Sequence, residues 1–261
     1  MRRYWRVYRT FFLSSLVREM EFRANFLAKV LQNLVWMAFT VVVVLVVYGH
    51  TDSVAGWGKG EAFILAATCF LMNSVFFALF MSVSEIPSMV RLGTLDFVVT
   101  KPIDSQFWIS VRRFNFDQVG LLVAGLVMVV LGVSMSGLSP SPAQWLAYAV
   151  TCAASLAIFY GFNLMLMTTG VWLVRVDNLW VLGDSVMQVA RFPLDIYQPS
   201  LQRFFLYAVP LGFLATVPAR QLARSADPTH SLMAVAWAVA FLVASRAFWR
   251  FAMTRYTSAS S

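Results

Sequence analysis

Charged side chains are scarce in this sequence, where Asp, Glu, Lys and Arg together make up 12% of the 261 residues. A soluble domain carries roughly 25% charged residues, so this shortage excludes an ordinary soluble fold. Apolar residues reach 60%, and the mean hydropathy is +0.72. The apolar runs are continuous rather than alternating, which predicts an all-α membrane protein and disfavours a transmembrane β-barrel. No polar stretch is long enough to bury its own core, so we expect a single membrane domain over residues 1–261.

Residues that commonly perform catalysis or bind metals are also few. The sequence has two histidines and two cysteines, and no H-x-x-x-H, C-x-x-C or G-x-S-x-G pattern occurs. His50 and His230 fall in expected external loops, while Cys69 and Cys152 lie inside apolar runs as packing residues. The string Gly58-Lys59-Gly60 lacks the spacing of a P-loop. We therefore expect no enzymatic activity, no metal site and no ATP binding by this chain itself.

Acidic residues are expected to be missing from the interior of the membrane. All twelve lie outside or at the edges of the apolar runs, and Asp184 falls on the polar side of an expected surface helix. An ion-coupled carrier usually needs an ionisable residue within its spans. The milder polar residues Asn73 and Asn163 are expected to form hydrogen bonds between helices.

Six apolar runs predict six transmembrane helices, over residues 26–48, 62–83, 119–136, 145–174, 204–217 and 232–249. The fifth is short and is broken by Pro210 and Gly212, so residues 219–231 are expected to re-enter the membrane. Residues 1–23 place aromatic side chains on one helical face and arginines on the other. That pattern predicts an amphipathic interfacial helix on anionic membrane lipids.

Basic residues gather in alternate segments of this six-span arrangement. With a cytosolic N-terminus, 17 Lys and Arg residues fall inside and 3 outside, which predicts cytosolic N- and C-termini. Two polar islands, 84–116 and 175–203, then both lie on the cytosolic side. The net charge of +8 is concentrated between the apolar runs, so nucleic-acid binding is not expected.

The first island, 84–116, predicts a short cytosolic helix on which another protein presses. It combines charges of both signs with an apolar side, a glycine that allows a tight turn and a proline that ends the element. The contact residues are expected to be Glu85, Arg91, Gly93, Leu95, Asp96, Lys101 and Pro102. The alternative interpretation is a solvated turn that carries positive-inside charges.

Two groups of short strings show a resemblance to a known family. One is Gly93-Thr-Leu-Asp-Phe-Val-Val-Thr-Lys-Pro102, and the other comprises Arg191-Phe-Pro-Leu-Asp-Ile-Tyr197, Tyr207-Ala-Val-Pro-Leu-Gly-Phe213 and Val217-Pro-Ala219. With the six spans and both termini inside, the whole chain resembles the permease subunit of an ABC-2-type exporter in the bacterial cytoplasmic (inner) membrane.

The resemblance implies a division of labour among subunits. The segment Glu85 to Pro102 would be a coupling helix docked in a groove of a cytosolic ATPase dimer, which binds the ATP and Mg. A second permease, either a related chain or a second copy, would complete the translocation unit. A second cytosolic contact, with the ATPase or the partner permease, would involve Arg191, Phe192, Pro193 and Asp195. Spans two and five would line a pathway for a lipid-like, glycolipid or drug-like substrate through Asn73, Phe76, Phe77, Phe80, Tyr207, Pro210 and Phe213.

Two other functions remain open from the residues alone. A secondary transporter or channel would work without ATP and would need an intramembrane ionisable residue or an internal repeat. A membrane enzyme or scaffold would need a polar cluster with acid/base geometry. The group nearest to such a cluster is Asp177, Asp184, Arg191 and Asp195.

Overall fold

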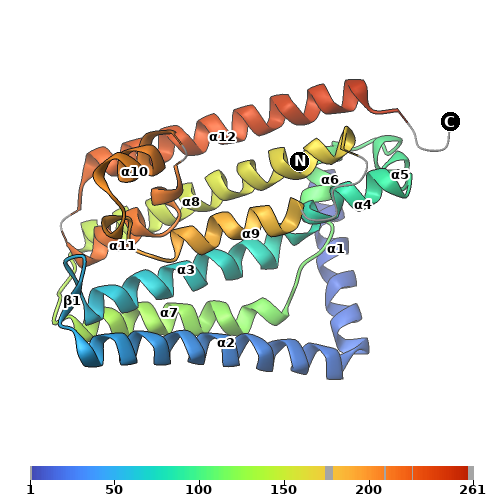
Figure 1. Cartoon of the computed structure of the whole chain (residues 1–261). Coiled ribbons are helices and arrows are strands. Elements are labelled where there is room, and N and C mark those ends of the chain that lie inside the picture. Colours follow the sequence, from blue (N-terminus) through green and yellow to red (C-terminus); the bar gives the residue numbers. More distant parts are fainter. Residues whose placement is uncertain (1, 174–178, 209, 225, 258–261) are drawn as a thin grey trace.

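The computed structural model describes residues 2–173, 179–208, 210–224 and 226–257, and this part of the chain is mostly helical. Long helices lie side by side in a bundle, with shorter helices at its two ends (Figure 1). The helices are α1 Arg2–Glu21, α2 Arg23–His50, α3 Lys59–Phe80, α4 Ile86–Arg91, α5 Asp96–Val99, α6 Ser105–Val111, α7 Asp117–Met135, α8 Pro142–Thr168, α9 Leu179–Ala190, α10 Pro199–Arg203, α11 Thr216–Ala223 and α12 Pro228–Arg255. The strands β1 Ser53–Val54 and β2 Trp57–Gly58 form one antiparallel hairpin between α2 and α3.

Five helices in the described residues are long and apolar enough to cross a membrane. They are Arg23–His50, Lys59–Arg91, Asp117–Met135, Pro142–Val171 and Pro228–Arg255. Each covers one of the predicted spans, so an all-α membrane protein is confirmed, whereas the six-span count is not. The predicted fifth span, 204–217, is a π-helical turn at Phe204–Ala208, a 3₁₀ turn at Leu211–Phe213 and the start of α11. Pro210 lies between the two turns and has no N–H for a helical hydrogen bond.

Helix α9 lies among the long helices of the bundle, whereas the predicted fifth span does not form one long helix. Helix α9 runs alongside α8 and α3 (Figure 1). The Trp180 ring meets Phe77 of α3 edge-on at 5.4 Å between centroids, and Met187 is 3% exposed. The surface helix predicted within residues 175–203 therefore corresponds to α9, whose apolar side packs against the bundle. Asp184 lies outside the five candidate spans, but it lines a cavity together with residues of α2, α3 and α7.

Glycines bring α3 and α7 into close contact. A Cβ atom at Gly132 would lie 2.9 Å from the backbone nitrogen of Ile64, and one at Gly125 would lie 3.4 Å from that of Leu71. Small residues allow helix backbones to approach in membranes, where van der Waals packing replaces the hydrophobic effect. Helices α3 and α7 therefore pack as one unit.

Helix α2 stands at the edge of the bundle and contains no fully buried residue (Figure 1). Helix α1 runs across the end of the bundle, and its aromatic face meets protein. Tyr4 contacts Phe107 at 4.9 Å between ring centroids, and Phe11 contacts Trp108 at 5.6 Å. The predicted amphipathic helix forms, but part of the face assigned to lipid packs on α6 instead.

Candidate functional site

Residues 81–113, called here the α4–α6 segment, form a compact unit at the end of α3. A 3₁₀ turn, Met81–Glu85, joins α3 directly to α4. Gly93 adopts φ +68°, a left-handed conformation that favours glycine, and turns the chain after α4. The carboxylate of Asp104 accepts a hydrogen bond of 2.9 Å from the backbone N–H of Phe107 and caps the start of α6. Pro102 is exposed in the turn between α5 and α6.

The inner side of the α4–α6 segment is buried against the long helices. Ile86, Leu95 and Ile109 are each 0% exposed, and they cluster with Leu164 of α8 and Trp249 of α12. Leu95 was predicted to contact a partner, and this burial makes it a core residue instead. Because these side chains are enclosed by α8 and α12, the segment is held as a rigid extension of the bundle.

The outer side of the segment exposes large apolar side chains beside positive charges. Leu92 is 69% exposed, Phe97 is 71% exposed and Val99 is 46% exposed. Arg91 and Lys101, both exposed, flank them in the sequence. We call Leu92, Phe97 and Val99 the apolar knob. Leu92 was not among the predicted contact residues. Its apolar neighbours Val90 and Leu95 are buried, so the apolar character of these residues in the sequence does not show which of them is exposed.

Glu85 holds the two ends of the segment together. Its carboxylate pairs with the guanidinium groups of both Arg112 and Arg113. The side chain of Glu85 is 25% exposed and that of Arg112 is 16% exposed. Glu85 therefore fixes the end of α6 against the start of α4. Asp96 and Arg91 are likewise engaged in interactions within the protein.

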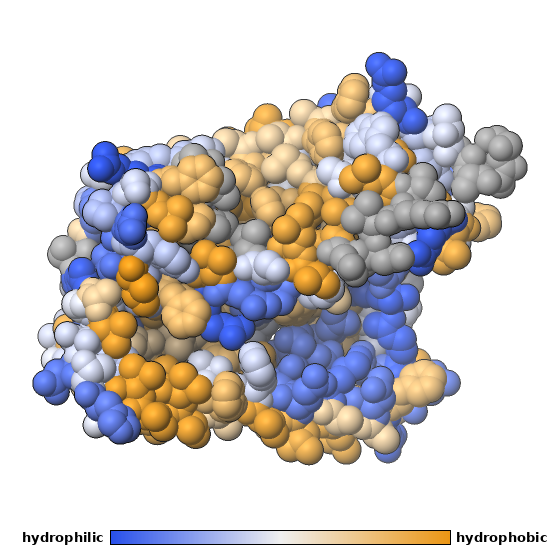
Figure 2. All heavy atoms as spheres, viewed as in Figure 1, coloured by the Kyte–Doolittle hydropathy of each residue, from blue (hydrophilic) through white to orange (hydrophobic). Residues whose placement is uncertain are grey.

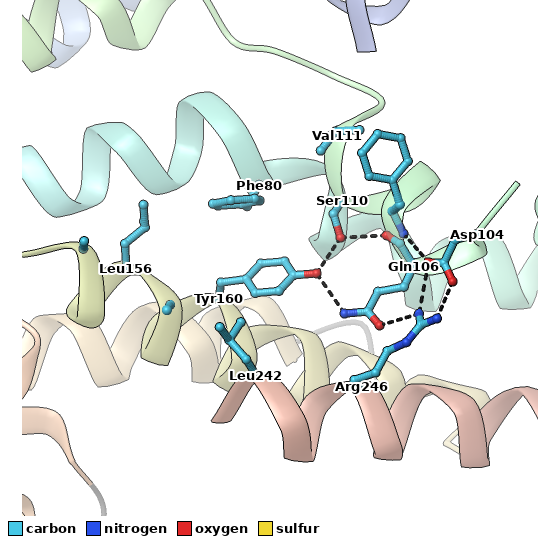
Figure 3. A pocket seen from close by; sticks show the side chains of 12 residues that line it. Phe80, Asp104, Gln106, Ser110, Val111, Leu156, Tyr160, Leu242 and Arg246 are labelled. Carbon is cyan, nitrogen blue, oxygen red and sulfur yellow. Dashed lines mark hydrogen bonds and ion pairs between the residues drawn. The ribbon is translucent and has the colours of Figure 1, made fainter. Parts of the chain in front are cut away.

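A polar network joins the α4–α6 segment to α8 and α12 (Figure 3). Arg246 of α12 donates hydrogen bonds to both carboxylate oxygens of Asp104, and its Nη1 also donates to Gln106 Oε1 at 2.9 Å. Gln106 Nε2 donates to the hydroxyl of Tyr160 in α8 at 3.1 Å, and Ser110 Oγ lies 2.7 Å from the same hydroxyl. Movement of α6 would therefore displace both α8 and α12.

The pKa of Asp104 lies below its ordinary value because of this network. Partial burial raises it, but hydrogen bonds from Arg246 and the Phe107 N–H, with the charges of Arg246 and Arg250, outweigh that effect. Asp104 is therefore ionised at neutral pH and its pair with Arg246 is intact. Beside the network lies a cavity of about 490 Å³ with mainly apolar walls, which include Phe80, Leu156 and Leu242 (Figure 3).

The second predicted contact, Arg191 to Asp195, is not at the end that carries the α4–α6 segment. Asp195 accepts a hydrogen bond of 2.7 Å from Nε1 of Trp57, in the hairpin that precedes α3. It also accepts from Arg220 Nη2 at 2.6 Å. The expectation that both polar islands share one end is wrong, because the apolar α9 carries the chain along the bundle between them. Phe192 is exposed and Pro193 is buried near that opposite end.

The predicted pathway residues do not form one continuous surface within this chain. Phe76 and Phe213 are core residues at 2% and 0% exposure, and Tyr207 is 53% exposed. Pro210 is buried. Phe80 lines the cavity of Figure 3, whereas Asn73 and Phe77 line a different cavity between α2, α3, α7 and α9. Asn73 donates to the carbonyl of Cys69 in its own helix at 3.0 Å, rather than to another helix.

Comparison with known proteins adds one match. The model of a family described as "ABC-2 family transporter protein" matches residues 34–260 of the chain. Among curated proteins, no relative matches the chain. The family match includes the α4–α6 segment, the lining of both cavities except Asn33, and the end at which Asp195 lies.

Proposed function

This chain belongs to the ABC-2 transporter family, and from that membership we propose that it is the permease subunit of an ATP-driven exporter. A cytosolic ATPase dimer would bind and hydrolyse the ATP with Mg, and this chain would form half of the translocation pathway. A second permease, either a related chain or another copy, would supply the other half.

The observation that carries this proposal is the apolar knob on the α4–α6 segment. Leu92 and Phe97 are among the most exposed large apolar side chains of the chain, yet the segment beneath them is tightly packed. An exposed apolar surface of this kind, next to charges, is typical of a protein–protein interface. A groove on the ATPase would receive the knob, and Arg91 and Lys101 would meet acidic residues around it.

The same segment offers a route for the mechanical step. Its 3₁₀ turn is continuous with α3, and the Asp104–Arg246 pair ties it to α12. When the ATPase dimer closes, a push on the knob would tilt α3 and α12 together. Rigid-body motion of packed helices is a common form of conformational switching.

We further propose that the α4–α6 end faces the cytosol of a bacterium and that both termini lie on that side of the inner membrane. The excess of Lys and Arg in the terminal segments and in residues 84–116 supports this orientation. The end that holds Trp57 and Asp195 would then face outward.

Affinity purification of the tagged chain from its native membrane in mild detergent tests the proposal. We expect a P-loop ATPase in near-equal amount, with a second permease if the unit is a pair of related chains. Recovery of the chain alone, under conditions that keep other membrane complexes intact, would argue against an ATP-driven exporter.

A carrier that works without ATP is the second candidate, and one observation favours it. Asp184 and Arg191 lie beside a cavity among the long helices, and ion-coupled carriers use such intramembrane charges. Transport into vesicles that contain only this chain, driven by a proton or sodium gradient, would support the carrier. Transport that requires both ATP and the ATPase would exclude it.

A further inference from the structure

A cavity of about 550 Å³ lies between α2, α3, α7 and α9. Figure 2 shows hydrophilic surface in a hollow between α2, along the lower edge of the view, and α9 above it. Aromatic side chains form part of the wall. The polar lining consists of Asn33, Asn73, Gln118, Asp184, Gln188 and Arg191.

The cavity lies in the half of the bundle nearer the α4–α6 segment. Gln118 belongs to the first turn of α7, and Phe77 lies three residues before the end of α3. Both helices meet the α4–α6 segment at those ends. A molecule that entered from the proposed cytosolic side would therefore reach this cavity before the Trp57 end.

Two opposite charges line the cavity, Asp184 on α9 and Arg191 in the turn directly after the end of that helix. Asp184 lies six residues before the last residue of α9, Ala190, which is a helical rise of about 9 Å. Gln188 Nε2 donates to Asp184 Oδ2 at 2.8 Å, so the other carboxylate oxygen remains available. The Arg191 guanidinium lies 5.6 Å from the centroid of the Trp36 ring. Within the described residues, neither charge belongs to an ion pair.

A further polar group in the cavity wall lacks a protein partner. Asn33 Nδ2 is buried and donates to no acceptor among the described residues. Unpaired charges and buried unpaired donors are costly at membrane depth. The cavity therefore presents a carboxylate, a guanidinium and an amide donor whose combined charge is zero, and a ligand with complementary groups would satisfy all three.

We propose that this cavity binds a zwitterionic group, with an ammonium against Asp184 and a phosphate or carboxylate against Arg191. Either a phospholipid headgroup or a free zwitterion of the phosphoethanolamine type has this chemistry. A purely anionic ligand would leave Asp184 facing a like charge, and a purely cationic one would do the same for Arg191. The assignment of this ligand as transported cargo rests on the proposed permease function, whereas its binding does not.

Equilibrium binding to the full-length chain tests the site. The chain is placed in nanodiscs of phosphatidylglycerol, so that zwitterions come only from the added probes. Radiolabelled dihexanoyl phosphatidylethanolamine is the lipid probe, phosphoethanolamine is the free probe, and dihexanoyl phosphatidylglycerol is the anionic competitor. We expect saturable binding of at least one zwitterionic probe and no competition by the anionic one. The probe that binds more tightly identifies the source of the headgroup.

Substitutions then assign the binding to this cavity. Asp184→Asn and Arg191→Gln should each weaken binding at least about tenfold, the effect of losing a hydrogen bond to a charged group. Ser185→Ala is the matched control, because Ser185 is exposed on the same helix and bonds to its own backbone. If Asp184→Asn and Arg191→Gln do not fold, Asn33→Leu on α2 tests the same cavity, and it should also weaken binding of the zwitterionic probe.

Unchanged binding in correctly folded Asp184→Asn and Arg191→Gln, or equal competition by the phosphatidylglycerol probe, would overturn the proposal. The result is independent of the ATPase. Zwitterion binding without any associated ATPase would keep this site and reject the exporter, whereas ATPase association without binding would reject only the site.

Discussion

Asp104, which caps α6, and Arg246, in the second half of α12, lie 142 positions apart in the sequence and are joined by two hydrogen bonds. This pair connects the segment that carries the apolar knob to the last long helix. Because Gln106 and Tyr160 extend the connection to α8, one polar network holds three elements at the same end of the bundle.

Under the proposed function, breaking the Asp104–Arg246 pair should uncouple the permease from the proposed ATPase. In Asp104→Asn, the guanidinium of Arg246 loses its charged partner, which should cost about 1–3 kcal/mol of folding free energy. ATPase binding should persist because the knob is unaltered, but stimulation of ATP hydrolysis by substrate should fall at least severalfold. Arg255→Gln, at the end of α12, is the control. Normal stimulation in Asp104→Asn would show that this network does not transmit the motion.

The contribution of this pair to stability should depend on pH in one direction. The pKa of Asp104 is lowered in the folded protein, so its stabilising effect is complete above the unfolded value, about 3.9. It is lost as the pH falls through the lower, folded pKa. The stability difference between wild type and Asp104→Asn should therefore be constant from about pH 5 to 8 and shrink below about pH 4. Thermal unfolding of both proteins over that range measures it, and a difference that grows in acid would contradict the assignment.

Removing the apolar knob should weaken ATPase binding without destabilising the permease. Burying a large apolar side chain contributes about 1.5–3 kcal/mol, so Leu92→Ser or Phe97→Ser should each lower the affinity about 10- to 100-fold. Their exposure of 69% and 71% predicts little change in thermal stability. Leu232→Ser, 72% exposed at the start of α12, is the matched control. If a variant that combines Leu92→Ser and Phe97→Ser still bound the ATPase, the interface would lie elsewhere on the permease.

Substitutions near Asp195 should affect stability and leave ATPase binding intact. Trp57 is 0% exposed, and its indole N–H donates to Asp195. Asp195→Ala would leave that N–H without an acceptor and Arg220 without its ion pair, for a loss of about 2–3 kcal/mol. Asp195→Asn retains an acceptor and should lose less. If folded Asp195→Asn failed to bind the ATPase, that result would support the prediction that Asp195 belongs to a second cytosolic contact.

Two glycines of α7 should respond in opposite directions to the same substitution. Gly132→Ala places a methyl group 2.9 Å from Ile64 atoms and should cost about 1–3 kcal/mol. Nothing lies within 4 Å of a Cβ at Gly120, so Gly120→Ala should gain about 0.5–1 kcal/mol from helix propensity. Reversible unfolding in mixed micelles compares the two. Equal effects would show that α3 and α7 do not pack as described.

The sequence predicts the long helices well, because a helix that crosses a membrane must be apolar along most of its length. The aromatic periodicity near the N-terminus likewise predicts α1. The family resemblance is confirmed by the matching family model. Gly93 and Pro102 mark real turns in the α4–α6 segment, because each restricts the backbone in a way that local sequence reveals.

Tertiary contacts explain what the sequence does not predict. Helix α9 has twelve residues and places Asp184 and Gln188 on the side opposite its apolar residues, a pattern that resembles that of a surface helix. Its position in the bundle depends on Phe77 and Asn163, which lie far away in the sequence. The burial of Leu95 and the exposure of Leu92 depend in the same way on where α8 and α12 lie. Because the sequence does not show that α9 lies along the bundle, Asp195 was expected at the same end as the α4–α6 segment, whereas Asp195 lies at the opposite end, beside Trp57.

The contrast between α2 and α9 has a consequence for biogenesis. Helix α2 is 28 residues long, and none of its residues is fully buried by the rest of the chain, so it can leave the translocon for lipid as soon as it is made. Helix α9 is too short to cross the bilayer by itself and carries a carboxylate. It can enter the membrane only after α3 and α8 are in place to receive it. Because α3 and α8 both precede α9 in the chain, they can form the site that receives α9 before it is made.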